Sequence, residues 1–148
     1  MRKGGERQEV RFLDSSVFVF SFLDKGRMGD QAGRVIRHIE EGVASFTSVL
    51  VIDEVIWILR KALKDYEKAI ELCRQLLRIG NLEVLPITLR ELTMALEFMH
   101  KYAVKPHDAL HIACMISNNL PIMVTQDPDF KSIKEIEVLT ISEFLARV

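Results

Sequence analysis

The stretch "IMVTQDPDF" (Ile122–Phe130) is an apolar run that ends abruptly in two aspartates. Its first four residues fit a short buried strand, and Asp127 and Asp129 follow at once with Pro128 between them. One aspartate is enough to make a turn, so the second carboxylate needs another explanation. The stretch "VRFLD" (Val10–Asp14) repeats the pattern, because an apolar strand is again closed by an acid.

Strand-like and helical segments alternate along the chain. The runs that we interpret as strands are Val10–Asp14, Val43–Thr47, Leu82–Ile87, Ile122–Thr125 and Ile136–Ile141. Helical spacing and capping residues predict helices at 30–41, 48–63 and 65–79, from the capping box at Thr88, and from Pro106 to the pair of asparagines. The segment "VFVFSFL" (17–23) alternates like a strand, but the serines before it offer an N-cap and favour a helix. The 48–63 segment is apolar almost all round, which predicts a buried helix.

This order of elements predicts an α/β fold with a mostly parallel sheet covered by helices on both faces. In such folds ligands bind outside the carboxyl ends of the strands, where the strand order reverses. Asp14 follows the first strand, and Asp127 and Asp129 follow the fourth. The three carboxylates are therefore expected at the same edge of the sheet.

The bulk properties indicate one globular domain over residues 10–148, after a flexible tail at 1–9 that is nearly free of apolar residues. The net charge of -1 gives no overall basic footprint, although local basic groups such as Arg60, Lys61 and Lys64 are present. No apolar run approaches the ~20 residues of a membrane span. The two cysteines lack the spacing of a metal site, so buried thiols in a cytoplasmic protein are expected.

Two further acids lie in unexpected surroundings. Glu54 stands within the apolar 49–59 segment, and burying an ionised carboxylate costs several kcal/mol unless it is compensated. Asp108 opens a helix whose next residues are apolar. Each acid has a purely structural explanation: Asp14 and Asp127 as turn or capping residues, Asp108 at the positive end of its helix, Glu54 in an ion pair.

One shared cause explains all these acids better than separate ones. Carboxylates gathered at one place repel each other and raise each other's pKa unless a cation joins them. A cluster of oxygen ligands without cysteine suits Mg²⁺ or Mn²⁺. Such sites typically hydrolyse phosphodiesters, because the metal lowers the pKa of water and neutralises charge on the phosphoryl group.

At this point the chain resembles the PIN-domain nucleases. The resemblance rests on "FLDSSVF", the "EV" at Glu54, "KPHDALHIA" and "VTQDPDF", which occur in the family's order from Val10 to about Ile141. It implies a three-layer α/β/α sandwich with a five-stranded sheet. It also implies that the catalytic, metal-binding acids are Asp14, Glu54, Asp108 and Asp127, with Asp129 as a further metal-site residue and Ser16 and Thr125 as auxiliary hydroxyls. Asp53 matches no acid of the family and is expected at the surface or in a cap.

The resemblance further implies an Mg²⁺- or Mn²⁺-dependent endoribonuclease that hydrolyses single-stranded or structured RNA. In size and motifs the chain is similar to the VapC-type toxins of prokaryotic toxin–antitoxin pairs, which implies a small antitoxin partner and a homodimer. The apolar segments 17–23 and 49–59 would suit a dimer interface, although they fit an internal core at least as well.

Two alternatives remain at this stage. His107 and His111 are four residues apart on a helix, a spacing that can share a zinc ion, but no third ligand is evident and packing or capping histidines are favoured. The protein could also be a catalytically silent PIN-like module that binds RNA or protein. The presence of all the expected acids speaks against a silent site.

Overall fold

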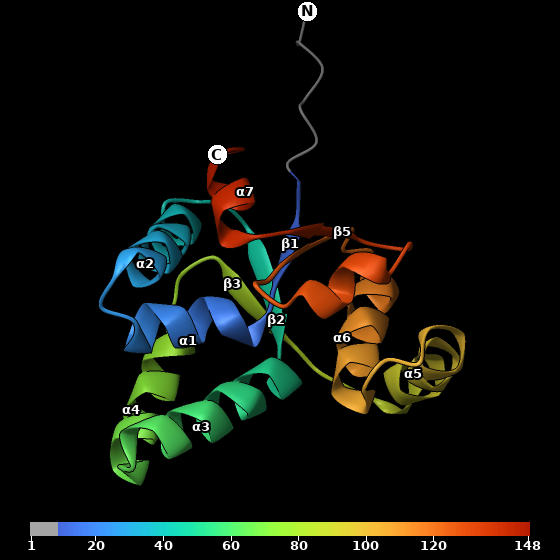
Figure 1. The fold of residues 1–148 in the computed structure, drawn as a ribbon, viewed down its shortest axis with the longest axis horizontal. Coiled ribbons are helices and arrows are strands. Elements are labelled where there is room, and N and C mark those ends of the chain that lie inside the picture. Colours follow the sequence, from blue (N-terminus) through green and yellow to red (C-terminus); the bar gives the residue numbers. More distant parts are fainter. Residues whose placement is uncertain (1–8) are drawn as a thin grey trace, which may run out of the picture.

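The computed structural model describes residues 9–148, and its five strands form one parallel sheet between helical layers (Figure 1). The strands are β1 (Arg11–Leu13), β2 (Ser45–Ser48), β3 (Leu82–Leu85), β4 (Ile122–Val124) and β5 (Glu137–Leu139). Their order in the sheet is β3-β2-β1-β4-β5. The predicted fold class is confirmed. Most of the predicted tail at 1–9 lies outside the described residues.

Helices cover both faces of this sheet (Figure 1). They are α1 (Ser15–Leu23), α2 (Arg27–Glu40), α3 (Val49–Leu63), α4 (Tyr66–Leu76), α5 (Leu89–Tyr102), α6 (Pro106–Ser117), the 3-10 helix η1 (Pro128–Ser132) and α7 (Ile141–Leu145). The first four lie on one side, with α7 packed against α2, whereas α5 and α6 pair on the other side. Within the described part of the chain, no helix combines the length and apolarity needed to cross a membrane.

The strand order reverses between β1 and β4. From β1 the chain runs outward through β2 to β3, and it then crosses back to add β4 and β5 on the other side of β1. Both central strands are completely buried, and Leu13 pairs with Val124 at their carboxyl ends. The residues that follow these two strands are therefore neighbours at the point where this fold class binds its ligands.

The helix starts follow local capping chemistry. Thr88 and Glu91 form the predicted capping box of α5, and the ambiguous 17–23 segment is part of helix α1, as favoured. The helix predicted from residue 30 begins three residues earlier, because the Asp24 carboxylate accepts hydrogen bonds from the N–H groups of Gly26 and Gly29. The helices η1 and α7 were not predicted. A Thr140 cap that accepts from Glu143 N–H starts α7 inside a segment interpreted as strand.

The prediction that α3 is buried almost all round is wrong. Val51, Val55 and Leu59 form a fully buried stripe, but Trp57 and Ile58 are exposed. Since successive helix positions differ by about 100°, an all-apolar sequence still presents one side outward. Helix α1 differs, because Val17 and Phe18 are buried and the other apolar residues of that segment pack against the core.

Candidate active site

The expected acids come from four separate parts of the fold. Asp14 follows β1 as the N-cap residue of α1, and Asp127 follows β4 as the N-cap residue of η1. Glu54 lies in the second turn of α3, and Asp108 lies in the first turn of α6. The fold gathers them, with Asp129, into two neighbouring groups.

The inner triad consists of Asp14, Glu54 and His111, each of which offers one ligand atom within 4.8 Å of the others. Nε2 of His111 lies 2.8 Å from Oε1 of Glu54 and 4.0 Å from Oδ1 of Asp14. Asp14 and His111 are buried. The ring of His111 also lies against Phe12 and Phe130. The inner triad is thus packed against mainly apolar surroundings.

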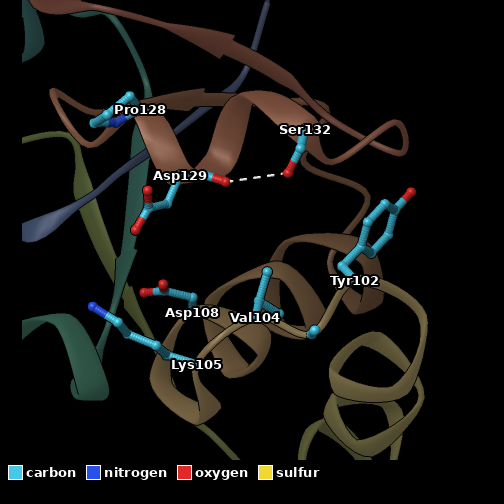
Figure 2. A pocket seen from close by; sticks show the side chains of 8 residues that line it. Tyr102, Val104, Lys105, Asp108, Pro128, Asp129 and Ser132 are labelled. Atoms are coloured by element: carbon cyan, nitrogen blue, oxygen red, sulfur yellow. Dashed lines mark hydrogen bonds between the residues drawn. The ribbon is translucent and has the colours of Figure 1, made fainter.

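The outer triad consists of Asp108, Asp127 and Asp129, whose ligand atoms also lie within 4.8 Å of one another. Figure 2 shows the side chains of Asp108 and Asp129 facing each other, one from α6 and the other from η1. Asp127 accepts a hydrogen bond from the N–H of Asp129 at 2.9 Å, which fixes the turn between them. Buried Phe130 anchors that turn to the core.

Thr125 joins the two triads. Its hydroxyl donates to Oδ2 of Asp14 at 2.6 Å, and Oγ1 of Thr125 also accepts from the N–H of Asp127 at 3.0 Å. The hydroxyl of Ser16 lies 3.4 Å from that of Thr125 and accepts from the N–H of Gln126. The two small hydroxyl residues expected near the acids therefore orient Asp14 and the loop that carries Asp127.

The pKa values of all three members of the inner triad are shifted. Burial raises the pKa of Asp14, in spite of the nearby His111 and the hydrogen bond from Thr125. Burial also acts to raise the pKa of Glu54, but the hydrogen bond and charge of His111 outweigh it and the pKa is lowered. Burial acts to lower the pKa of His111, and the surrounding carboxylates outweigh it and raise the pKa. Glu54 and His111 thus form an ion pair with Asp14 beside it.

Asp108 shows that the two triads interact. Its pKa is raised to about 6, first by burial and then by the charges of Asp127, Asp14 and Glu54, although His111 acts to lower it. A carboxylate that is destabilised by three others is the signature of a site that gains from a cation. The donors are hard oxygen atoms together with one imidazole, a set that suits a divalent cation.

His111 is the residue whose role the sequence did not reveal. It was interpreted as a packing or capping histidine, and it is indeed buried, but it also binds Glu54. Its Nδ1 has no hydrogen-bond partner within residues 9–148. The available signal was its position three residues after Asp108 on one helix, which places both on the same face. His107 lies 3.3 Å from the same Glu54 oxygen, whereas Asp53 is exposed, as expected.

Two cavities open beside the acids. One of about 420 Å³ is lined by Tyr102, Ala103, Val104, Lys105, Asp108, Pro128, Asp129 and Ser132 (Figure 2). The other, of about 290 Å³, is lined by Asp53, Glu54, Trp57, Ile58 and His107. Each cavity contains at least one acid of a triad.

Comparison with known proteins gives a consistent family and fold. The family model described as "PIN domain" matches residues 11–136. No curated protein matches the chain. Among solved structures, VapC20 of Mycobacterium tuberculosis, described as a sarcin-ricin loop cleaving toxin, is similar at 18% identity and a TM-score of 0.71, covering 86% of this chain and 98% of that one.

Two solved complexes contain similar chains. VapBC2 from Rickettsia felis, bound to a DNA fragment from its promoter, matches at 16% identity and a TM-score of 0.70, covering 88% of this chain and 98% of that one. A toxin-antitoxin complex from Klebsiella pneumoniae matches at 18% identity and a TM-score of 0.64, covering 88% and 97%. At these identities the likeness establishes the shared fold.

Proposed function

This chain belongs to the PIN domain family, and on that premise we propose that it is a divalent-metal-dependent endoribonuclease that hydrolyses phosphodiesters of single-stranded RNA. The observation that carries this proposal is the gathering of carboxylates from the ends of β1 and β4 and from α3 and α6 into two adjoining triads. The pKa of Asp108 is raised to about 6, first by burial and then by the charges of three other carboxylates, which shows that gathering these acids costs free energy. A cation would remove the cost.

The residues that would hold Mg²⁺ or Mn²⁺ are Asp14, Glu54, Asp108 and Asp127. Asp129 is the most exposed member of the cluster, which suits a role through water or at the rim of the site. Two of these ligands are already oriented, Asp14 by Thr125 and Glu54 by His111, and such supporting contacts hold metal ligands in place. The bound metal would supply an activated water and neutralise charge on the phosphate.

The side chains divide the remaining work between them. Water attacks phosphorus directly, and the proton that it loses passes to a carboxylate. The phosphorus–oxygen bond to the leaving nucleotide then breaks, and the leaving oxygen takes up a proton from water to become a hydroxyl group. No side chain forms a covalent bond to phosphorus in this scheme, so the site needs no nucleophilic side chain.

RNA as the substrate is supported by the surroundings of the triads. Lys105 lines the larger cavity together with Asp108 and Asp129 (Figure 2), where its ammonium group can bind a phosphate. Lys101 is less suited, because it pairs with Glu135 at 2.5 Å. The similar VapC20 is described as a toxin that cleaves the sarcin-ricin loop, which favours RNA, single-stranded or structured, over other phosphodiesters.

A toxin role is proposed from the same likenesses. The similar chains in the Rickettsia and Klebsiella structures belong to complexes described as VapBC2 and as toxin-antitoxin. We therefore propose a small antitoxin protein as partner, and from the resemblance of the sequence we propose a homodimer as the working form. Production of the chain alone should arrest growth, and production with the antitoxin should relieve the arrest.

An RNA-cleavage assay tests the enzymatic proposal. Purified protein should cleave single-stranded RNA with Mn²⁺ or Mg²⁺, stop when EDTA is added, and lose cleavage in Asp14→Asn and Asp127→Asn. Glu97→Gln removes an exposed carboxylate of α5 that lines neither cavity and should retain cleavage. If the wild type is as inert as the two variants on varied RNAs, the protein is a binding module rather than a nuclease.

A further inference from the structure

Trp57 is a large apolar side chain exposed next to the acids. It is the only tryptophan of the chain, and 55% of its surface is accessible. It follows Glu54 by one helical turn in α3. Because buried apolar surface stabilises a fold and exposed apolar surface does not, an exposed tryptophan beside a charged site points to contact with a ligand.

One face of helix α3 carries an acid, an aromatic ring and a cation in succession. Glu54, Trp57 and Lys61 are spaced by three and four residues, so they lie on one face of the helix. The Nζ of Lys61 lies 4.3 Å from the centre of the Trp57 ring. Arg60 and Lys64 close the same helix. From Glu54 to Lys61 this face runs about 10 Å along the axis, from the acids to a positively charged end.

The cavity of about 290 Å³ connects Trp57 to the acids. Five residues line it, including the ring of Trp57, the side chain of Ile58 and Glu54 of the inner triad. Lys61 approaches the ring from outside this lining. The ring therefore borders a space whose α3 wall combines the apolar side chains of Trp57 and Ile58 with the acids Asp53 and Glu54.

We propose that Trp57 is a stacking platform for an unpaired base of the RNA substrate, with Lys61 binding a phosphate of the same strand. This proposal rests on the proposed nuclease function and specifies where the bound RNA strand lies beside the acids. Aromatic rings bind single-stranded nucleic acid through stacking, because every base offers a π-face, and neighbouring cations bind the backbone. Paired bases are stacked within a duplex and cannot use such a platform, so the site selects unpaired RNA.

Charge favours RNA over an apolar protein as the occupant. The exposed apolar surface here consists of Trp57 and Ile58, and it ends at Arg60, Lys61 and Lys64. A protein partner that covered the ring would desolvate these cations unless it brought acids of its own. A nucleic acid strand brings a base and a phosphate together, which matches the order of groups along α3.

Fluorescence of Trp57 tests the proposal directly, because the chain has no other tryptophan. Asp14→Asn protein, used so that the probe stays intact, is titrated in Mg²⁺ with a short labelled single-stranded RNA and with a matching abasic probe. Binding is followed in parallel by anisotropy of the label. The RNA should quench the emission of Trp57 in a saturable way, whereas the abasic probe should bind more weakly and leave the emission unchanged.

Variants separate stacking from general contact. Trp57→Ala should weaken RNA binding about 5- to 150-fold, and Trp57→Phe should retain most of the binding. The matched control is Leu96→Ala on α5, which removes an equally exposed apolar side chain that lines neither cavity. This control should bind RNA as the parent protein does.

Several results would overturn the platform. They are an unchanged emission when anisotropy shows saturation, a Trp57→Ala protein that binds RNA like its parent, and an absence of RNA binding. An emission that shifts with protein concentration in the absence of RNA would show that a second copy covers Trp57. The nuclease proposal is judged separately: cleavage that depends on Asp14 without quenching rejects only the platform, and quenching by a protein that never cleaves rejects only the hydrolysis.

Discussion

Replacing Asp108 with asparagine should stabilise the metal-free protein at neutral and alkaline pH. The pKa of Asp108 rises from 3.8 to about 6 in the folded chain, first through burial and then through the other acids. Because the fold disfavours the ionised form, the carboxyl group costs nothing below about pH 3.8, and its cost grows until the pH exceeds about 6. Asparagine has nearly the same shape and carries no charge, so it avoids this cost.

The magnitude follows from the same two values. A difference of about 2 pKa units corresponds to about 3 kcal/mol at 1.36 kcal/mol per unit. Asp108 is only half-buried, so solvent screens part of the repulsion, and we expect about 1.5 kcal/mol. For a chain of this size such a gain raises the Tm by about 3–6 °C.

Urea unfolding in EDTA provides the assay, with wild type and Asp108→Asn compared at pH 8 and at pH 4. The free energy of unfolding of the variant should exceed that of the wild type at pH 8, and the gain should shrink at pH 4. Asp53→Asn, which removes an exposed carboxylate, should change little at either pH. With Mg²⁺ present the order should reverse, because only the wild type keeps the full set of ligands and ligand binding stabilises the folded state. A variant that is no more stable than the wild type at pH 8 in EDTA would refute the idea of a repulsive cluster.

Three further substitutions test other parts of the structure. Thr125→Val removes the hydroxyl that donates to buried Asp14, so it should lower the free energy of unfolding by about 1–3 kcal/mol. It should also weaken Mn²⁺ binding, measured by calorimetry, about 10- to 100-fold. An unchanged Mn²⁺ affinity would contradict the role of Thr125 in orienting Asp14. Phe130→Ala empties a buried position behind the Asp127–Asp129 turn and should cost about 3–5 kcal/mol in urea unfolding, so a loss under 1 kcal/mol would disprove the anchoring role. Thr88→Ala removes the N-cap of α5 and should cost about 1 kcal/mol without affecting RNA cleavage, and a loss of cleavage would show that α5 contributes to the site.

The sequence predicted the fold because its strongest signals are local. Short apolar strands separated by capped helices indicate a parallel sheet, and the Thr88–Glu91 capping box was placed correctly. What failed were features that depend on surroundings. The exposure of Trp57 follows from which side of α3 meets α1 and α4, and an apolar sequence cannot reveal that side. The Thr140 cap that starts α7 at residue 141 was missed, because the apolar run around Thr140 was interpreted as a strand.

For the site, the strand-end rule placed Asp14 and Asp127 at one edge of the sheet, and the fold joins them through Thr125. The separation into two triads could not be predicted, because it depends on where α3 and α6 approach the edge of the sheet. The role of His111 escaped prediction for a related reason. Its partner Glu54 is distant in sequence, and only the packed structure brings the ring to that carboxylate.

An anomalous difference map from crystals soaked in Mn²⁺ tests the central claim most directly, since it shows both whether a cation binds and which oxygens hold it. We expect a peak among the triads, with carboxylate oxygens of Asp14 and Asp127 as ligands and those of Glu54 or Asp108 beside it. The absence of a peak at these carboxylates, at a Mn²⁺ concentration that supports RNA cleavage, would contradict the account, as would a peak bound only elsewhere on the molecule.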